Sequence, residues 1–451
     1  MIYTKHMNFI LGITKKMLPS WAYRRLVDDW DQGGLKKYFI NTGWMLSARI
    51  ATFFTSFLTM AIVARYLGPE NLGKLSYAQS FVAILSVFAS LGIDQIIYRD
   101  LVSHPDKKDE ILGTAIFSKF VFGTITFFGT IGISVLLGTE TLITVLVGII
   151  AFTFVIGPIG TLGVLFQAQV QAKYLARWTI FIAFFMPALK LLIVYYDKGL
   201  LYFASLVILE ALLSGIYSIY IYRTHFAGKI SLLHFDLSIF TRLMKDAWPL
   251  LFASVSAYIY AKIDQVMILH YMDATAVGFY SAAVRIKEVW IFIPSIIIAS
   301  LFPALVNARE KDRGTYIQRL RSLSILTLVI TFALTLPLFI FSAQVIHLIF
   351  GTAFLPASSI LKIYIWTAVG NVLLMLIKHY LIAENLTKII LISTTVGATV
   401  NIALNSLLIP LYGAQGAAYA TLVTLGLVFI TNLFFKRVRT TLLSVCCISR
   451  T

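Results

Sequence analysis

Long apolar stretches alternate with short polar segments along almost the whole chain. Twelve of these stretches are close to the roughly 20 residues that an α-helix needs to cross a bilayer, or longer. The pattern predicts spans at residues 41–66, 76–98, 111–137, 142–167, 178–196, 200–222, 248–271, 276–305, 322–348, 357–382, 388–411 and 415–435. We therefore predict an all-α polytopic membrane protein with twelve transmembrane helices, and the mean hydropathy of +0.87 agrees with this.

The polar segments differ strongly in their basic residues. If the N-terminus is cytoplasmic, 26 of the 37 lysines and arginines fall in cytoplasmic segments, and only Arg65, Lys74 and Lys198 fall in outer loops. Cytoplasmic loops of membrane proteins carry such an excess, so both termini are expected in the cytoplasm. The net charge of +17 is explained by this topology and by attraction to anionic lipid headgroups, and no nucleic-acid partner is expected.

Two weak internal repeats relate the halves of the chain. Matches lie 205 residues apart in four pairs and 217 residues apart in two, namely Tyr66/Tyr271, Gly73/Gly278, Ser76/Ser281, Ala78/Ala283, Gly199/Gly416 and Tyr202/Tyr419. They predict two six-helix bundles related by a pseudo-two-fold axis along the membrane normal, as in an alternating-access transporter. A receptor or membrane scaffold is the alternative. The predicted organisation is a cytoplasmic amphipathic segment at 1–38, bundles at 39–222 and 248–435, a cytoplasmic linker at 223–247, and a cytoplasmic tail at 436–451.

The sequence gives no sign of a catalytic domain outside the membrane. Apart from 223–247 and the termini, no segment between the predicted spans is long enough for a domain outside the membrane. The only cysteines, Cys446 and Cys447, are adjacent in the tail, and no glycine-rich phosphate loop adjoins a predicted strand. We expect no enzyme activity, no catalytic residue, no metal site and no cofactor, and uphill transport would have to use an ion gradient.

The chain resembles a family in five segments. These are ARYLGPENLGKLSY at 64–77, LGIDQIIYRDL from Leu91, KIDQVMI from Lys262, VGFYSAAVRIKEVW from Val277, and NIALNSLLIPLYGAQGAAYAT from Asn401. They resemble, in order and over nearly the whole chain, the polysaccharide transporters, the O-antigen and capsule repeat-unit flippases of the multidrug/oligosaccharidyl-lipid/polysaccharide exporter superfamily.

The resemblance implies movement of an undecaprenyl-diphosphate-linked oligosaccharide from the cytoplasmic to the periplasmic leaflet of a bacterial inner membrane. Other polysaccharide-assembly membrane proteins are further possible partners. The alternatives are a related exporter of another cargo, namely a peptidoglycan-precursor flippase or a cation-coupled multidrug antiporter, and a membrane polymerase or ligase that uses the same lipid carrier. Short outer loops disfavour the polymerase and ligase.

Charged side chains inside the spans mark the expected site, because charge at membrane depth is costly and usually functional. The predicted spans contain eight lysines and arginines but only three carboxylates. This excess of positive charge suits an anionic diphosphate and disfavours a drug cation. We predict that a cationic cleft binds the cargo through Lys190, Arg285, Arg49, Lys119, Lys262 and Lys287. Lys362 and Lys378 are near span ends, and we expect them to reach the headgroups instead.

Depth along the helices pairs Asp264 with Arg285 and Lys190 with Glu210. Each pair either fixes helix register or releases its carboxylate when cargo takes the cation. The ion-coupling candidates are Asp264, Glu288 and Glu210, and the residues do not choose between H⁺, Na⁺ and uncoupled flipping.

Two asparagines and several helix-breaking residues complete the expectations. Asn401 and Asn405 share one helix face, where they either contact sugar hydroxyls or hydrogen-bond between helices. Bending points are expected where Pro and Gly interrupt spans, at Gly157, Pro158, Gly160, Pro294, Pro303 and Pro337.

Overall fold

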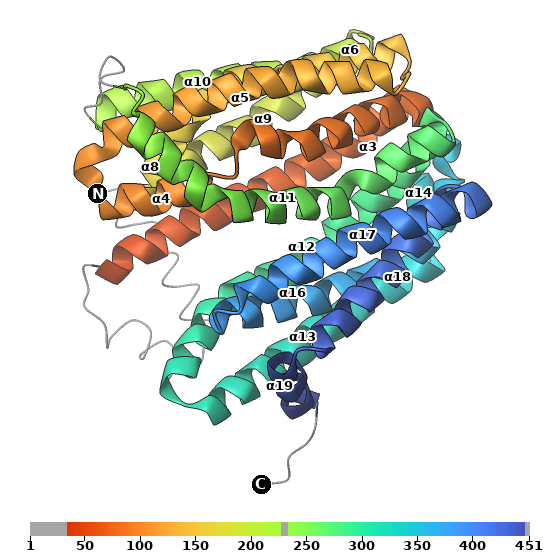
Figure 1. Ribbon diagram of the computed structural model, residues 1–451. Helices are drawn as coiled ribbons and strands as arrows, with labels where there is room; N and C mark the ends of the chain where they lie inside the picture. The colour runs from red at the N-terminus through yellow and green to blue at the C-terminus, as the bar shows by residue number, and fades with distance from the viewer. Residues whose placement is uncertain (1–33, 227–232, 447–451) are drawn as a thin grey trace, which may run out of the picture.

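The computed structural model describes residues 34–226 and 233–446, and those residues are almost entirely helical (Figure 1). The N-lobe comprises α3 (Gly34–Ser90), α4 (Asp94–Ser103), η1 (Pro105–Lys107), α5 (Lys108–Leu136), α6 (Thr141–Ala151), α7 (Thr153–Ile156), η2 (Gly157–Thr161), α8 (Leu162–Ala168), α9 (Lys173–Tyr195) and α10 (Leu200–His225). The C-lobe comprises α11 (Leu237–Tyr271), α12 (Ala274–Lys311), α13 (Arg313–Ile340), α14 (Ser342–Phe350), η4 (Thr352–Phe354), α15 (Ala357–Tyr364), α16 (Thr367–Ala383), α17 (Thr387–Tyr412), α18 (Ala414–Leu433) and α19 (Lys436–Cys446). Most of the predicted amphipathic segment 1–38 lies outside the described residues.

Every predicted span lies on a helical segment. Nine described helices are long and apolar enough to cross a membrane. One of them includes α3, which holds most of two predicted spans on either side of Gly68, where the backbone leaves the helical conformation. The spans at 248–271 and 276–305 lie on α11 and α12. These two helices are not among the nine, because their charged residues lower the mean hydropathy. The all-α membrane fold is confirmed.

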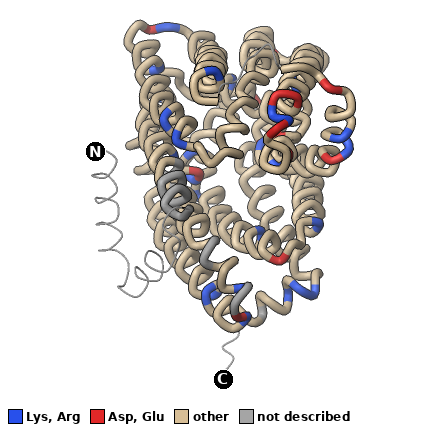
Figure 2. The backbone as a smooth tube through the Cα atoms, turned by 90° about the vertical axis from the view of Figure 1, so that its left-hand side faces the viewer, with Lys and Arg blue, Asp and Glu red and all other residues tan. Residues whose placement is uncertain are grey.

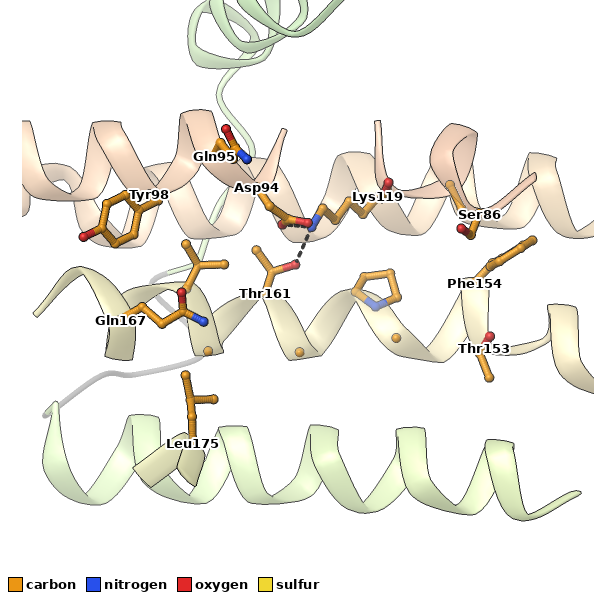
Figure 3. Close-up of a pocket in the computed structure, with 17 residues that line it drawn as sticks. Ser86, Asp94, Gln95, Tyr98, Lys119, Thr153, Phe154, Thr161, Gln167 and Leu175 are labelled. Atoms are coloured by element: carbon orange, nitrogen blue, oxygen red, sulfur yellow. Dashed lines mark hydrogen bonds and ion pairs between the residues drawn. The ribbon is translucent and has the colours of Figure 1, made fainter. Parts of the chain in front are cut away.

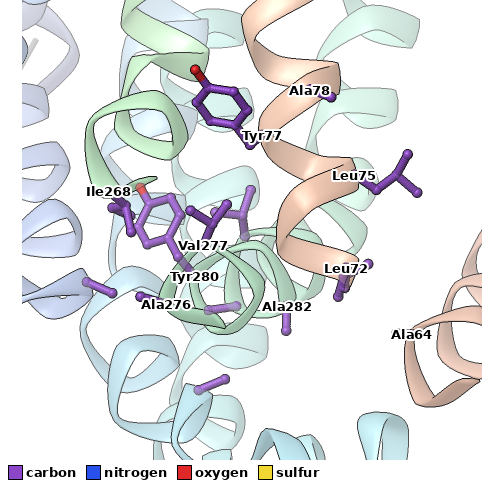
Figure 4. Close-up of a cluster of buried hydrophobic side chains, with 14 of the residues drawn as sticks. Ala64, Leu72, Leu75, Tyr77, Ala78, Ile268, Ala276, Val277, Tyr280 and Ala282 are labelled. Carbon is purple, nitrogen blue, oxygen red and sulfur yellow. The ribbon is translucent and has the colours of Figure 1, made fainter. Parts of the chain in front are cut away.

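One hydrophobic core joins helices of both lobes at one end of the bundle, which we call the closed end. This core joins Leu72, Leu75 and Ala78 of α3 to Ile268 of α11 and Val277 of α12 (Figure 4). At the opposite end each lobe has a core of its own. One core is built on α4, α5, α8, α10 and the start of α11, and the other on α12, α13, α16, α17 and α19. Apart from the first turns of α11, which belong to the first of these two cores, the lobes share their hydrophobic core at the closed end.

A reciprocal glycine contact lies at the closed end. A Cβ atom on Gly73 would stand 1.7 Å from the carbonyl oxygen of Ala274, and a Cβ on Gly278 would stand 1.9 Å from that of Pro69. Both glycines and both partners are 205 residues apart, so each lobe presents the same surface to the other, as in an isologous contact. The sequence repeat thus has a physical cause, because only glycine lets the two backbones approach this closely.

The first turns of α11 pack on the N-lobe. Asp236 caps the helix by accepting a hydrogen bond from the backbone N–H of Ile239. Ile239 and the residues one and two turns further along the helix belong to the N-lobe core, and Arg242 lies 2.9 Å from Asp100 of α4. After Pro249 the same helix packs against α17 of the C-lobe. It therefore spans the boundary between the lobes.

The predicted bend in the span 142–167 is confirmed. The segment η2 is a 3₁₀ turn that separates α7 from α8 at Pro158. By contrast, α12 and α13 continue through Pro294 and Pro337 without a break. The proline alone does not decide the outcome, because η2 also contains Gly157 and Gly160, which lower the helix propensity further.

Candidate functional site

A cavity of about 740 Å³, the inter-lobe cavity, lies between the two lobes. Its N-lobe wall comes from α3, α8 and α9, and its C-lobe wall comes from α12. Arg49 lies on the first wall and Arg285 on the second, with Glu288 one turn further along α12. The remaining lining consists of apolar, hydroxyl and amide side chains. Two of the predicted cargo cations therefore face one cavity from opposite lobes.

Lys190 of α9 extends this positive region. It is half-buried and lies close enough to Arg285 and Glu210 to interact electrostatically with both. Its predicted partner Glu210 is on α10, but no ion pair within 4 Å joins the two in the part of the chain that the structure describes. Lys190 thus interacts electrostatically with a cation of the C-lobe and with a carboxylate of its own lobe.

Lys262 and Lys287 have partners of different kinds. The ammonium of Lys262 on α11 lies 3.9 Å from a carboxylate oxygen of Glu288. The ammonium of Lys287 lies 5.1 Å from the centre of the Tyr364 ring, in a cation–π contact. Neither lysine lines the inter-lobe cavity. Glu288 therefore balances part of the positive charge that surrounds the cavity.

Lys119 lies in a second cavity of about 860 Å³, the N-lobe chamber, shown in Figure 3. Its ammonium pairs with Asp94 and donates to the hydroxyl of Thr161 at 3.1 Å. Asp94 thus neutralises a predicted cargo cation. The N-lobe chamber adjoins the inter-lobe cavity, because Gln167 and Leu175 line both.

Asp264 is the centre of a buried polar cluster in the C-lobe. Its carboxylate accepts hydrogen bonds from the hydroxyl of Tyr280, from the amide of Asn405 at 2.7 Å, and from the hydroxyl of Thr421 at 2.8 Å. The same Asn405 amide donates to the Asn401 carbonyl oxygen at 3.1 Å. Four helices, α11, α12, α17 and α18, supply these groups. The cluster is rich in oxygen atoms and has one formal negative charge.

The structure corrects two predictions about this cluster. The pairing of Asp264 with Arg285 is wrong, because Tyr280, Asn405 and Thr421 surround the carboxylate, and the nearest opposite charge to Arg285 is Glu288. Asn401 and Asn405 share a helix face as predicted, but both are fully buried and line neither the inter-lobe cavity nor the second cavity. In this conformation Asn405 forms a hydrogen bond between helices, which was one of the two predicted roles, and neither asparagine is exposed for contact with a sugar.

Sequence reasoning missed three residues of these sites. Tyr280 and Thr421 carry no charge, so nothing in a hydrophobic span distinguishes them from ordinary packing residues. Asp94 could have been noticed, because Gly92 precedes it and a glycine can end a helix. In the structure the backbone has positive φ at Leu91 and Gly92, and the helix is interrupted there. Recognising that α4 begins at Asp94 would have set this carboxylate at the start of a new helix, where the structure shows it lining a cavity.

Residues 39–308, more than half of the chain, match the family described as polysaccharide biosynthesis protein. The chain belongs to this family. Two curated relatives of this chain come from Haloferax volcanii. It is 26% identical over 173 residues to the probable low-salt glycan biosynthesis flippase Agl15, and 28% identical over 195 residues to the probable flippase AglR. These matches cover 38% and 40% of this chain, and 36% and 39% of the length of those relatives.

A solved structure of the lipid II flippase MurJ in an inward closed conformation has the same fold as this family member. The TM-score is 0.68, the alignment covers 90% of each chain, and the sequence identity is 16%. The resemblance to polysaccharide transporters is therefore confirmed at the level of family and fold.

Proposed function

We propose that this chain is a flippase that moves an undecaprenyl-diphosphate-linked oligosaccharide repeat unit, of the O-antigen or capsule type, across the membrane by alternating access. The observation that carries the proposal is the pair of arginines, Arg49 and Arg285, on opposite walls of the inter-lobe cavity. A guanidinium can hold a phosphate through two parallel hydrogen bonds. An anion between the two arginines would contact both lobes at once.

The electrostatics of the cavity favour an anionic cargo. Lys190 and Arg285 repel each other across the lobe boundary, and burial makes this repulsion stronger than it would be in water. A diphosphate between them replaces the repulsion with two attractions. Binding of the cargo would thus draw the lobes together, which is the step that an alternating-access cycle requires.

The two ends of the bundle support an orientation in the membrane. The shared core seals the closed end, while at the opposite end two separate cores lie apart and the start of α11 is the element that belongs to the N-lobe core. Figure 2 looks onto that opposite end and shows Lys and Arg around its rim. The excess of basic residues there supports a cytoplasmic location. We propose a multi-pass protein of the bacterial inner membrane with both termini cytoplasmic and the cavity accessible from the cytoplasm.

Asp264 is our candidate for ion coupling. A carboxylate with hydroxyl and amide oxygens from four helices can hold either H⁺ or Na⁺, since hard cations prefer oxygen ligands. The cluster is linked to the cargo site through α11, because Lys262, two residues before Asp264, contacts Glu288 at the inter-lobe cavity. A bound cation and a bound cargo would therefore act on the same pair of helices.

Neutralising Arg285 tests the cargo site. Arg285→Gln is expected to lower translocation of a polyprenyl-diphosphate-linked oligosaccharide in proteoliposomes by roughly 10- to 100-fold, because a charged hydrogen bond is worth about 1.5–3 kcal/mol. Arg285→Lys should retain part of the activity, since it keeps the charge but not the two parallel hydrogen bonds. Protein abundance should not change, because Arg285 has no ion-pair partner within 4 Å in the described residues.

Lys378→Gln provides a matched control, because Lys378 is an exposed cation on α16 that lines neither cavity. It should transport like the parent. Normal transport by a well-inserted Arg285→Gln protein would remove the cargo-site assignment. Transport of a cationic drug, with no transport of the lipid-linked oligosaccharide by the parent, would replace the proposed function by an antiporter.

The proposed topology has its own test. Reporter fusions after Phe226 and after Cys446 should be active only in the cytoplasm, while a fusion in the loop after Gly138 should be active only in the periplasm. Periplasmic activity of the fusion after Phe226 would contradict the orientation without changing the fold.

A further inference from the structure

The N-lobe chamber belongs to one lobe only. Its walls come from α3, α4, α5, α7, η2, α8 and α9, and none comes from the C-lobe. Its volume of about 860 Å³ lies in the range of pockets that enclose a ligand of several rings. The chamber therefore has the size of a binding site and does not depend on the lobe boundary.

The charge of the chamber argues against a second phosphate site. Lys119 is the lysine or arginine that lines it, and Asp94 neutralises this side chain through a direct ion pair. Lys119 is also buried, with 9% of its side chain exposed, and its ammonium has a further partner in Thr161. A ligand of this chamber is therefore expected to be polar but uncharged where it touches these residues.

Two of the polar side chains that line the chamber have no hydrogen-bond partner in the described part of the chain. Figure 3 shows Tyr98 and Gln167 on two sides of one space, with the Asp94–Lys119 pair next to them. Both side chains are exposed, and neither has a hydrogen-bond partner in the described part of the chain. A glutamine amide donates and accepts, as a sugar hydroxyl does, and a tyrosine ring offers a flat apolar face.

The backbone of η2 forms another wall. Non-helical backbone at membrane depth is tolerated where protein covers it or where it lines a water-filled cavity. A Cβ atom on Gly157 or Gly160 would meet nothing within 4 Å, so these positions leave the backbone open to the chamber. At these two positions no side chain separates the backbone from the chamber.

We propose that the N-lobe chamber is the sugar-recognition subsite, in which Tyr98 and Gln167 contact the uncharged part of the oligosaccharide and help to select the repeat unit. This inference rests on the proposed flippase function. Gln167 lines both cavities, so a cargo whose diphosphate lies between Arg49 and Arg285 has its first sugars at the entrance of the chamber. The inter-lobe cavity would then bind the diphosphate, and the N-lobe chamber would bind the sugars.

A protection experiment tests occupancy directly. Tyr98→Cys is made in a background in which Cys446 and Cys447 are replaced by serine, and a maleimide reports access to the thiol. Polyprenyl diphosphate that carries a neutral oligosaccharide should slow the labelling at least severalfold, while polyprenyl diphosphate alone should not. Gln169→Cys is the control, because Gln169 is exposed, lies beside the chamber and does not line it. Equal labelling of Tyr98→Cys with both lipids would overturn the subsite.

A transport experiment separates this proposal from the flippase function. Tyr98→Leu and Gln167→Leu should each lower translocation of the oligosaccharide-bearing lipid by up to roughly tenfold and leave translocation of the bare lipid diphosphate unchanged. Tyr220→Leu and Gln169→Leu, at exposed positions outside the chamber, should behave like the parent. If the parent moves neither lipid, the flippase function fails. If the parent moves both, but Tyr98→Leu and Gln167→Leu affect both lipids equally or neither, only the sugar subsite fails.

Discussion

Adding a single methyl group at Gly278 is expected to reduce transport by about ten- to a hundredfold. The new Cβ would stand 1.9 Å from the carbonyl oxygen of Pro69, so α3 and α12 would have to separate at the closed end. Overpacking of this kind costs about 1–3 kcal/mol. Gly278→Ala and Gly73→Ala should therefore shift the population away from the conformation that is sealed at this end.

Ser76 reports this shift. It lies one turn from Gly73 and is 3% exposed, so a Ser76→Cys thiol should react slowly with a water-soluble maleimide. The same thiol should react at least tenfold faster when Gly278→Ala is present. Gly426→Ala is the control, because its Cβ would meet nothing within 4 Å. Protection of Ser76→Cys together with normal transport in Gly278→Ala would show that the glycine contact is not needed for closure.

The second large effect is expected at Asp264. Asp264→Asn replaces the carboxylate by a neutral amide, which resembles a permanently protonated carboxyl group. Transport of the lipid-linked oligosaccharide into proteoliposomes should then lose its stimulation by an imposed H⁺ or Na⁺ gradient, while binding of the cargo at Arg285 remains. Asp264 is buried among three hydrogen-bond donors, so the variant should also lose about 1–3 kcal/mol of stability, measured by thermal unfolding.

Thr421→Val separates coupling from stability. It removes one donor to Asp264 but keeps the carboxylate, so transport should weaken and still respond to the gradient. Because Arg285 is not the partner of Asp264, removing both charges should not restore function, and the two effects should add. Gradient-stimulated transport by Asp264→Asn equal to that of the parent would exclude this residue and direct attention to Glu288 and Glu210.

The membrane fold could be predicted because its causes are local. A run of about 20 apolar residues is sufficient to place a span, and each predicted span lies on a helix. The relation between the lobes was also visible, since Gly73 and Gly278 keep the same spacing to Pro69 and Ala274. The close approach of α3 and α12 at these glycines could not be predicted, because it depends on how the two lobes pack together.

The partner of Asp264 could not be predicted from depth alone. Depth gives the position of a residue along a helix but not the direction in which its side chain points. Tyr280 faces Asp264, and Arg285 follows five residues later, which turns it by about 140° around α12. The two charges therefore lie at a similar depth and face different neighbours. The same limit applies to Lys119, whose partner Asp94 comes from another helix.

The position of α11 also has a consequence for biosynthesis. Ile239, Leu243 and Ala247 fill the core of the N-lobe, so that lobe cannot finish folding when its last helix, α10, leaves the ribosome. It has to wait for the first turns of the next helix, and chains fold from the N-terminus during synthesis. Once those turns are in place, the rest of α11 is already fixed in direction, and Asp264 is held ready for helices that have not yet been made. The first half of the chain thus serves as a template for the assembly of the second.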